Sequence, residues 1–188
     1  MTTEDDDKCD HEFTISGHVA PLLTDERSIE VWANYHPNYG NGFEKLFVSE
    51  PEGGRWKVVN IPFYLYGMKL GSIVEIENWQ IIKVLETPEE LSLRLVFFGE
   101  ETKRTALEHS KLVECAYVDQ MFTRFVALQA RPGMQSELEA IIREWTDSNL
   151  IEFAEDLMVE PFESGPSLAD GLNADFRIWD PQVRSFSK

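Results

Sequence analysis

The segment NIPFYLYGMKLGSIVE, residues 60–75, constrains the fold of this chain more than any other. Pro62 fixes its own φ and has no N–H to donate, so a strand that ends near Asn60 must turn there. Gly67 and Gly71 can adopt positive φ, which suits a chain that reverses direction twice within a short distance. The segment therefore predicts a strand end, a proline corner, a row of aromatic residues, a two-glycine turn and a new strand.

Length and composition indicate a globular chain with an acidic surface. The 188 residues, 43% of them apolar, suit one domain, or two small packed halves, with a sizeable core. The net charge is −17, and the acidic residues are concentrated towards the two ends. This charge disfavours nucleic acid and anionic membranes as partners, because their phosphates would be repelled. It favours a basic protein partner; alternatively, it belongs to an ordinary solvated surface.

The start of the sequence predicts a disordered leader on a cytoplasmic protein. Residues 1–12 are acidic and contain little apolar surface, which cannot offset the entropy lost on ordering. Their charge is the opposite of that in a secretory or transit segment, and no apolar run approaches the ~20 residues of a membrane helix. Cys9 and Cys115, the two cysteines, are expected to be free thiols.

Residues 13–98 are predicted to form a β-rich half, either a small barrel or a curled antiparallel sheet. Ile29, Val31 and Ala33 alternate with other residues in the period-two pattern of a half-buried strand. Residues 43–59 have the pattern of a hairpin with a glycine-containing turn. Further strands are predicted over residues 73–79 and 91–98, and residues 81–85 either extend the first of these or form another strand.

Residues 99–159 are predicted to form an α/β half that, with the preceding strand, resembles a split βαβ arrangement. The strongest helix signal follows residue 133, where Ser136 and Glu139 match a capping box. Apolar residues recur there at helical spacing, namely Met134, Leu138, Ile141, Ile142 and Trp145. The other elements predicted are helices over residues 101–110 and 150–157, a strand over residues 122–129 and a turn-rich segment over residues 160–188. The predicted fold class is α+β.

The sequence contains no recognisable catalytic or metal-binding motif. It has no glycine-rich phosphate loop, no Gly-x-Ser-x-Gly elbow and no paired-histidine metal motif. The Cys-Asp-His sequence at residues 9–11 does not match a zinc spacing, and Cys115 alternates with apolar residues as a core residue does. No spacing links the four histidines, which are His11, His18, His36 and His109. We therefore predict no catalytic residues, no metal and no cofactor, and a protein that is not an enzyme.

The segment at residues 60–75 resembles the hallmark of an uncharacterised bacterial domain-of-unknown-function family. The matching residues are Asn60-Ile61-Pro62-Phe63, Tyr66-Gly67, Gly71 and Val74-Glu75. Family members carry NIPF-x-x-YG-x-x-x-GD-x-V after a short hairpin, and the resemblance extends over residues 44–147. The chain departs from the family at Ser72, where relatives usually carry Asp. The resemblance implies a shared fold, while the family has no established activity.

The acidity and the lack of a catalytic set predict a non-enzymatic binding protein, specifically an immunity-type protein that neutralises a cognate bacterial toxin. Acidic segments can steer and hold a basic partner such as a nuclease. The loop at residues 35–42 is a second candidate patch because Tyr is a rigid contact residue, although its rings alternatively pack on the sheet edge. The predicted partner-binding residues are Glu152, Glu155, Asp156, Glu160, Glu163, Tyr35 and Tyr39.

Two alternative functions are consistent with the sequence. In the first, the aromatic residues Phe63, Tyr64 and Tyr66 line a pocket of a small-molecule-binding protein or enzyme. Arg94 or Glu75 would supply the polar groups of that pocket, although the three rings alternatively belong to the core. In the second alternative, the chain is a scaffold or regulatory module whose acidic tails serve as docking segments.

Overall fold

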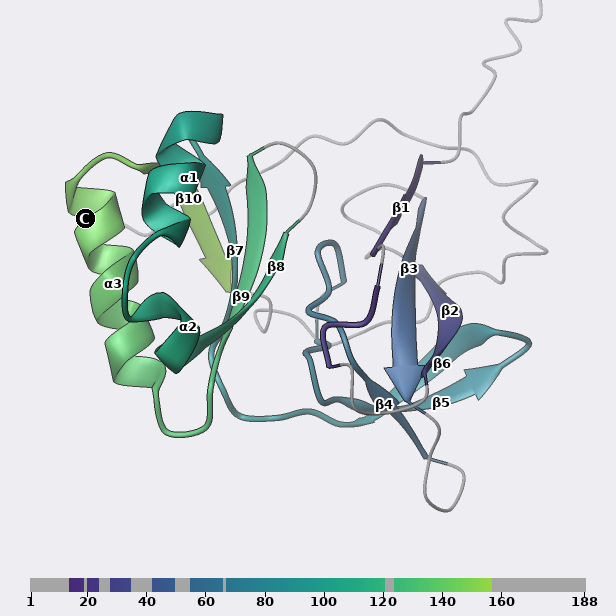
Figure 1. The fold of residues 1–188 in the computed structure, drawn as a ribbon. Coiled ribbons are helices and arrows are strands. Elements are labelled where there is room, and N and C mark those ends of the chain that lie inside the picture. The colour runs from purple at the N-terminus through teal and green to yellow at the C-terminus, as the bar shows by residue number, and fades with distance from the viewer. Residues whose placement is uncertain are drawn as a thin grey trace, which may run out of the picture.

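Two groups of secondary-structure elements make up the described part of the chain (Figure 1). The computed structural model describes residues 14–18, 20–23, 28–34, 42–49, 55–65, 67–120 and 124–156. Within these ranges the strands form one six-stranded and one four-stranded sheet, and the helices accompany the second. The predicted class, α+β and rich in strands, is confirmed.

The strand pairings of the first sheet close into a ring. Its strands are β1 (Thr14–Gly17), β2 (Ser28–Asn34), β3 (Gly42–Ser49), β4 (Trp56–Val58), β5 (Ile73–Glu77) and β6 (Gln80–Glu86). The order is β1-β3-β2-β6-β5-β4, and β3 also pairs with β4, so only β1 lies outside the ring of described strands. The alternation predicted for β2 is confirmed, since Val31 and Ala33 are buried and Glu30 is exposed.

The second sheet begins with the next strand along the chain. Its elements are β7 (Ser92–Phe97), α1 (Glu100–Leu107), α2 (Leu112–Cys115), β8 (Ala116–Gln120), β9 (Phe125–Ala130), α3 (Gln135–Asp147) and β10 (Ile151–Asp156). The order is β10-β7-β9-β8, and every pairing is antiparallel. The change of sheet therefore falls between β6 and β7, earlier than the boundary predicted between residues 98 and 99.

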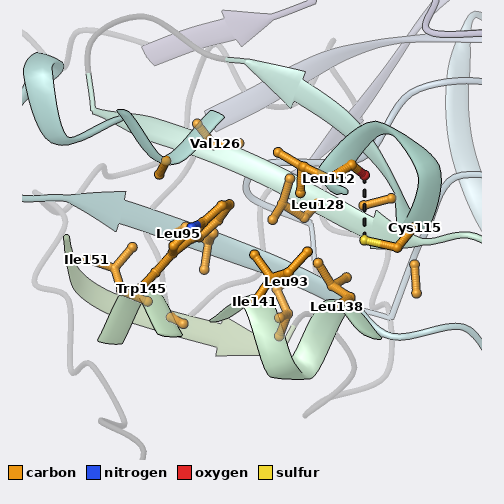
Figure 2. Close-up of a cluster of buried hydrophobic side chains, with 14 of the residues drawn as sticks. Leu93, Leu95, Leu112, Cys115, Val126, Leu128, Leu138, Ile141, Trp145 and Ile151 are labelled. Atoms are coloured by element: carbon orange, nitrogen blue, oxygen red, sulfur yellow. Dashed lines mark hydrogen bonds between the residues drawn. The ribbon is translucent and has the colours of Figure 1, made fainter. Parts of the chain in front are cut away.

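Helix α3 covers the face of the second sheet that points away from the first sheet (Figure 1). Leu138, Ile141 and Trp145 lie at the predicted helical spacing and are buried against β7. Figure 2 shows these side chains beside Leu93 and Leu95. The apolar periodicity thus predicted both the helix and its buried face. Among the described residues, no helix is long and apolar enough to cross a membrane.

The helix predicted over residues 150–157 is wrong, because residues 151–156 form strand β10 instead. This strand pairs with the edge of β7 and satisfies backbone groups that would otherwise be left without partners. Its register shifts between Ile151 and Phe153. The irregularity removes the period-two alternation and lets Ile151 and Ala154 both be buried. Buried residues three positions apart, Ile151 and Ala154, therefore give this strand the spacing expected of a helix.

The predicted capping box of α3 is also wrong. The helix begins at Gln135 with Met134 at its N-cap, and no side chain caps it. Ser136 lies inside the first turn, two positions after the N-cap, which is too late to cap. A turn leads directly into the helix. In this turn the Met134 N–H donates to Arg131 O at 2.9 Å, and Gly133 has a φ of 77°. Backbone geometry thus decides where this helix begins.

The two-glycine turn predicted after the proline corner is confirmed. Gly67 and Gly71 have φ values of 69° and 90°. The Gly71 N–H donates to Val58 O at 2.8 Å, and the Ser72 N–H donates to Lys69 O at 3.0 Å. These bonds return the chain from the end of β4 to the start of β5.

Replacing Gly71 by Ala is expected to destabilise the protein by about 2–3 kcal/mol. A Cβ at this position would lie 3.2 Å from Pro88 Cγ in a backbone conformation that L residues rarely adopt. Gly133→Ala is the matched control, because Gly133 also has positive φ but a Cβ there would meet nothing within 4 Å. That variant should lose about 1 kcal/mol. Equal losses in urea unfolding would contradict the proposed clash with Pro88.

Candidate functional site

Residues 60–65 and 67–72, here called the junction segment, lie between the two sheets and contact both. Towards the first sheet, the Phe63 N–H donates to Glu44 on β3. Towards the second sheet, Gln129 Nε2 on β9 donates to Leu70 O at 2.8 Å, and a guanidinium N–H of Arg94 on β7 donates to Phe63 O. An apolar cluster lies alongside and includes Ile61, Phe63, Leu70 and Ala127. The segment whose sequence most constrains the fold therefore forms the contact between the two sheets.

Glu44 is fully buried on β3 and binds the chain just after the proline corner. Its Oε1 accepts the Phe63 N–H at 2.6 Å, and its Oε2 accepts the Tyr64 N–H at 2.9 Å. Pro62 has no N–H and turns the chain, so that the next two backbone donors reach the same carboxylate. Hydrogen bonds to a carboxylate are among the stronger ones in proteins. This side chain therefore holds the junction segment on the first sheet.

His18 joins Glu44 to the second sheet. It follows β1, is buried, and its Nε2 lies 3.1 Å from Glu44 Oε1. Its Nδ1 lies 3.0 Å from Asp119 Oδ2 on β8, as an ion pair rather than a well-directed hydrogen bond. The imidazole also stacks on Phe63, with ring centroids 4.8 Å apart. These contacts tie β1, β3, β8 and the junction segment together.

The surroundings of His18 favour its charged form. Burial by itself lowers the pKa of this imidazole, because it penalises the charge. The contacts with Asp119 and Glu44 outweigh that effect and raise the pKa to about 9. At neutral pH the site is therefore an imidazolium held between two carboxyl groups.

Asn60 completes the buried polar cluster. Its Oδ1 accepts the Phe47 N–H at 3.2 Å, and its Nδ2 donates to Ala20 O at 3.0 Å and to Asp119 Oδ2 at 3.1 Å. The amide thus reaches β3, the segment after β1 and β8 from a single position. An Asn at the first position of the NIPF sequence is explained by these three bonds.

The polar cluster of His18, Glu44, Asn60 and Asp119 was missed by sequence reasoning. Its members lie in separate segments and share no motif. One signal was present: Glu44 occupies the same alternating face of β3 as Leu46 and Val48, which are both fully buried. A carboxylate in register with buried apolar residues indicates a buried polar contact.

The polar cluster acts as a structural clamp: its hydrogen bonds hold separate chain segments together. The donors and acceptors around Glu44 and Asn60 are largely backbone groups, and their bonds fix chain segments rather than face a ligand. Within the described residues, no group of three or more His, Cys, Asp or Glu side chains is placed to hold a metal ion. Cys115 is buried in the second sheet's core, and burial raises the pKa of its thiol.

The predicted acidic contacts lie partly on one edge strand. Glu152, Glu155 and Asp156 belong to β10, not to the outer face of a helix. Glu152 is exposed and forms an ion pair with Arg124 at 2.9 Å. The other predicted partner-binding residues lie outside the described residues, namely Tyr35, Tyr39, Glu160 and Glu163. Three of the predicted residues therefore lie on one edge strand.

The aromatic residues of the junction are mainly used in packing. Phe63 is buried against His18. Tyr64 is half-buried, and its pKa is raised by burial and by Glu44 against a smaller opposite effect of Arg94. Arg94 is buried and binds Phe63 O, whereas Glu75 is exposed on β5. The core interpretation thus holds for Phe63, while Tyr66 lies outside the described residues.

Comparison with known proteins gives a likeness in fold. No protein-family model matches this chain, and no curated protein matches it. A solved structure described as a hypothetical protein from Neisseria gonorrhoeae aligns with a TM-score of 0.51 and 15% sequence identity. The alignment covers 73% of this chain and 97% of the other. The chain is therefore similar in fold to that bacterial protein.

Proposed function

We propose that this chain is a non-enzymatic, acidic, cytoplasmic binding protein of the immunity type, which neutralises a cognate bacterial toxin by direct contact. The observation that carries the proposal is the use of the buried polar cluster. Its His and carboxyl groups have the chemistry of a catalytic site, yet both carboxyl groups accept backbone N–H groups of residues 61–64, and His18 lies between these two carboxyl groups. What the molecule offers a partner is its surface, and the net charge of −17 fits a basic protein.

In this proposal the two sheets form a rigid scaffold that holds the contact residues in place. In the proposal, the six-stranded sheet is a small barrel, the four-stranded sheet is a split βαβ unit, and the chain belongs to the family that the NIPF sequence resembles. Glu152, Glu155 and Asp156 on β10 supply acidic contacts at the rim of the interface. Such rim charges act mainly on the rate of association.

The first test of the proposal is a toxicity-rescue assay with the product of the adjacent gene. Co-expression of this chain should restore growth, and the two purified proteins should form a complex. The triple variant E152Q/E155Q/D156N should associate more slowly at low salt, and the difference should shrink at high salt.

The matched control changes the same amount of charge at another place. The exposed residues Glu100, Glu101 and Glu108 lie on and just after α1. The variant E100Q/E101Q/E108Q should associate at nearly the rate of the wild type. Absence of both rescue and complex formation by the wild type would refute the proposed function.

A further inference from the structure

The hairpin between β5 and β6 ends in an unusual residue. Its two turn residues, Asn78 and Trp79, have φ values of 49° and 66°. A two-residue turn with both φ values positive favours Asn followed by Gly, because Gly adopts this conformation without steric cost. A bulky residue with positive φ is an outlier that the surrounding structure must maintain. The second position of this turn is therefore occupied against local preference.

The fold uses the backbone of Trp79 and not its side chain. The carbonyl oxygen of Trp79 accepts the N–H of Trp32 at 2.9 Å, which attaches β2 to the hairpin. Glycine at position 79 would provide the same carbonyl. The indole, by contrast, is 63% exposed. Folding thus explains the conformation at this position but leaves the large aromatic side chain unexplained.

The surroundings of the hairpin tip indicate the chemistry of a partner. Glu75 and Glu77 are exposed on β5. On β6, Ile82 is 37% exposed where the register shifts, because Ile76 pairs with Ile81 and Glu75 pairs with Lys83. Two exposed carboxylates thus stand against one exposed ammonium group, that of Lys83 opposite Glu75. An exposed tryptophan and an isoleucine in this acidic setting complement an apolar pocket with a basic rim. Tryptophans that are exposed in the free protein and become buried on binding contribute much of the binding energy at many protein interfaces.

We propose that the tip of the β5–β6 hairpin docks the basic protein partner, with Trp79 inserted into an apolar pocket and Glu75 and Glu77 facing basic residues around it. The inference rests on the proposed function and adds to the acidic contacts proposed on β10 an apolar anchor on the first sheet. The turn fixes the backbone from which the indole projects, so little backbone order has to be gained on binding.

The test compares Trp79→Gly with the wild type in binding to the purified, catalytically inactive product of the adjacent gene. Gly suits positive φ, so the thermal midpoint of the variant should equal or exceed that of the wild type. Its affinity should fall by at least about 30-fold, as for an interface hot spot. Phe98→Ala and Val113→Ala, which remove exposed apolar side chains elsewhere, should bind as the wild type does. The variant E75Q/E77Q should associate more slowly, chiefly at low salt.

Each outcome decides the matter. If the wild type binds and Trp79→Gly binds equally well, the hairpin proposal is overturned while the proposed function stands. If the wild type neither binds nor rescues growth, both fall together. If the wild type sediments as a dimer and Trp79→Gly as a monomer, the indole contacts a second copy of this chain, and the proposed docking of a basic partner is overturned.

Discussion

Glu44→Gln is expected to lower the free energy of unfolding by about 3–5 kcal/mol, because it breaks a buried charged pair. The carboxylate accepts two backbone N–H groups and contacts His18 with no exposure to water. An amide can accept with its oxygen, but its NH₂ group would face a second donor. The variant thereby leaves a buried N–H without a partner and His18 with one carboxyl group fewer.

Urea unfolding with an unchanged m-value measures this loss. The matched control is Glu30→Gln on the neighbouring strand, since Glu30 is exposed and its ion pair with Lys45 spans 3.4 Å. That variant should change stability by about 0–1 kcal/mol. A Glu44→Gln variant as stable as Glu30→Gln would show that the clamp contributes little to the fold.

The second large effect is expected from pH. The pKa of His18 is about 9 in the folded protein, against 6.5 for an ordinary histidine, so the folded state binds the proton more tightly. Its contribution to stability is complete below pH 6.5 and is lost as pH rises to 9. The loss amounts to about 3 kcal/mol, since one pKa unit corresponds to roughly 1.4 kcal/mol.

The difference between the pH profiles of the wild type and His18→Gln isolates this contribution. The variant is less stable throughout, but its unfolding free energy should fall less steeply than that of the wild type between pH 6.5 and 9. Val113→Ala, a change at an exposed position, serves as the control and should keep the wild-type slope. Parallel profiles for the wild type and His18→Gln would be incompatible with a charged His18 at the junction.

The patterns that predicted elements correctly are those that depend on one face of one element. Val31 and Ala33 in β2 are examples, as are Leu138 and Trp145 in α3. The alternation of residues 91–98 predicted a strand but not the burial of every residue of β7. That burial arises because α3 packs on one face, while Arg94 on the other contacts the junction segment. The residue pattern along one strand does not reveal which elements will pack on its two faces.

The candidate sites likewise combine features that the sequence predicted with features that depend on tertiary structure. Glu152 was identified by its charge, but its place on an edge strand depends on pairing with β7. The exposed Trp79 was not singled out, because a single tryptophan in a sequence does not reveal the φ of its backbone. The sign of that φ follows from the hairpin and from the bond to Trp32, which only the folded chain contains.

By itself the sequence determined the corner and the turns of residues 60–75, because Pro62, Gly67 and Gly71 restrict or free their own φ angles. Such restrictions act within a residue or two. Tertiary structure alone decided that this segment lies between two sheets and that Glu44 and His18 meet there. Their meeting depends on strands brought together from distant parts of the chain, and no local preference encodes the partner of a buried charge.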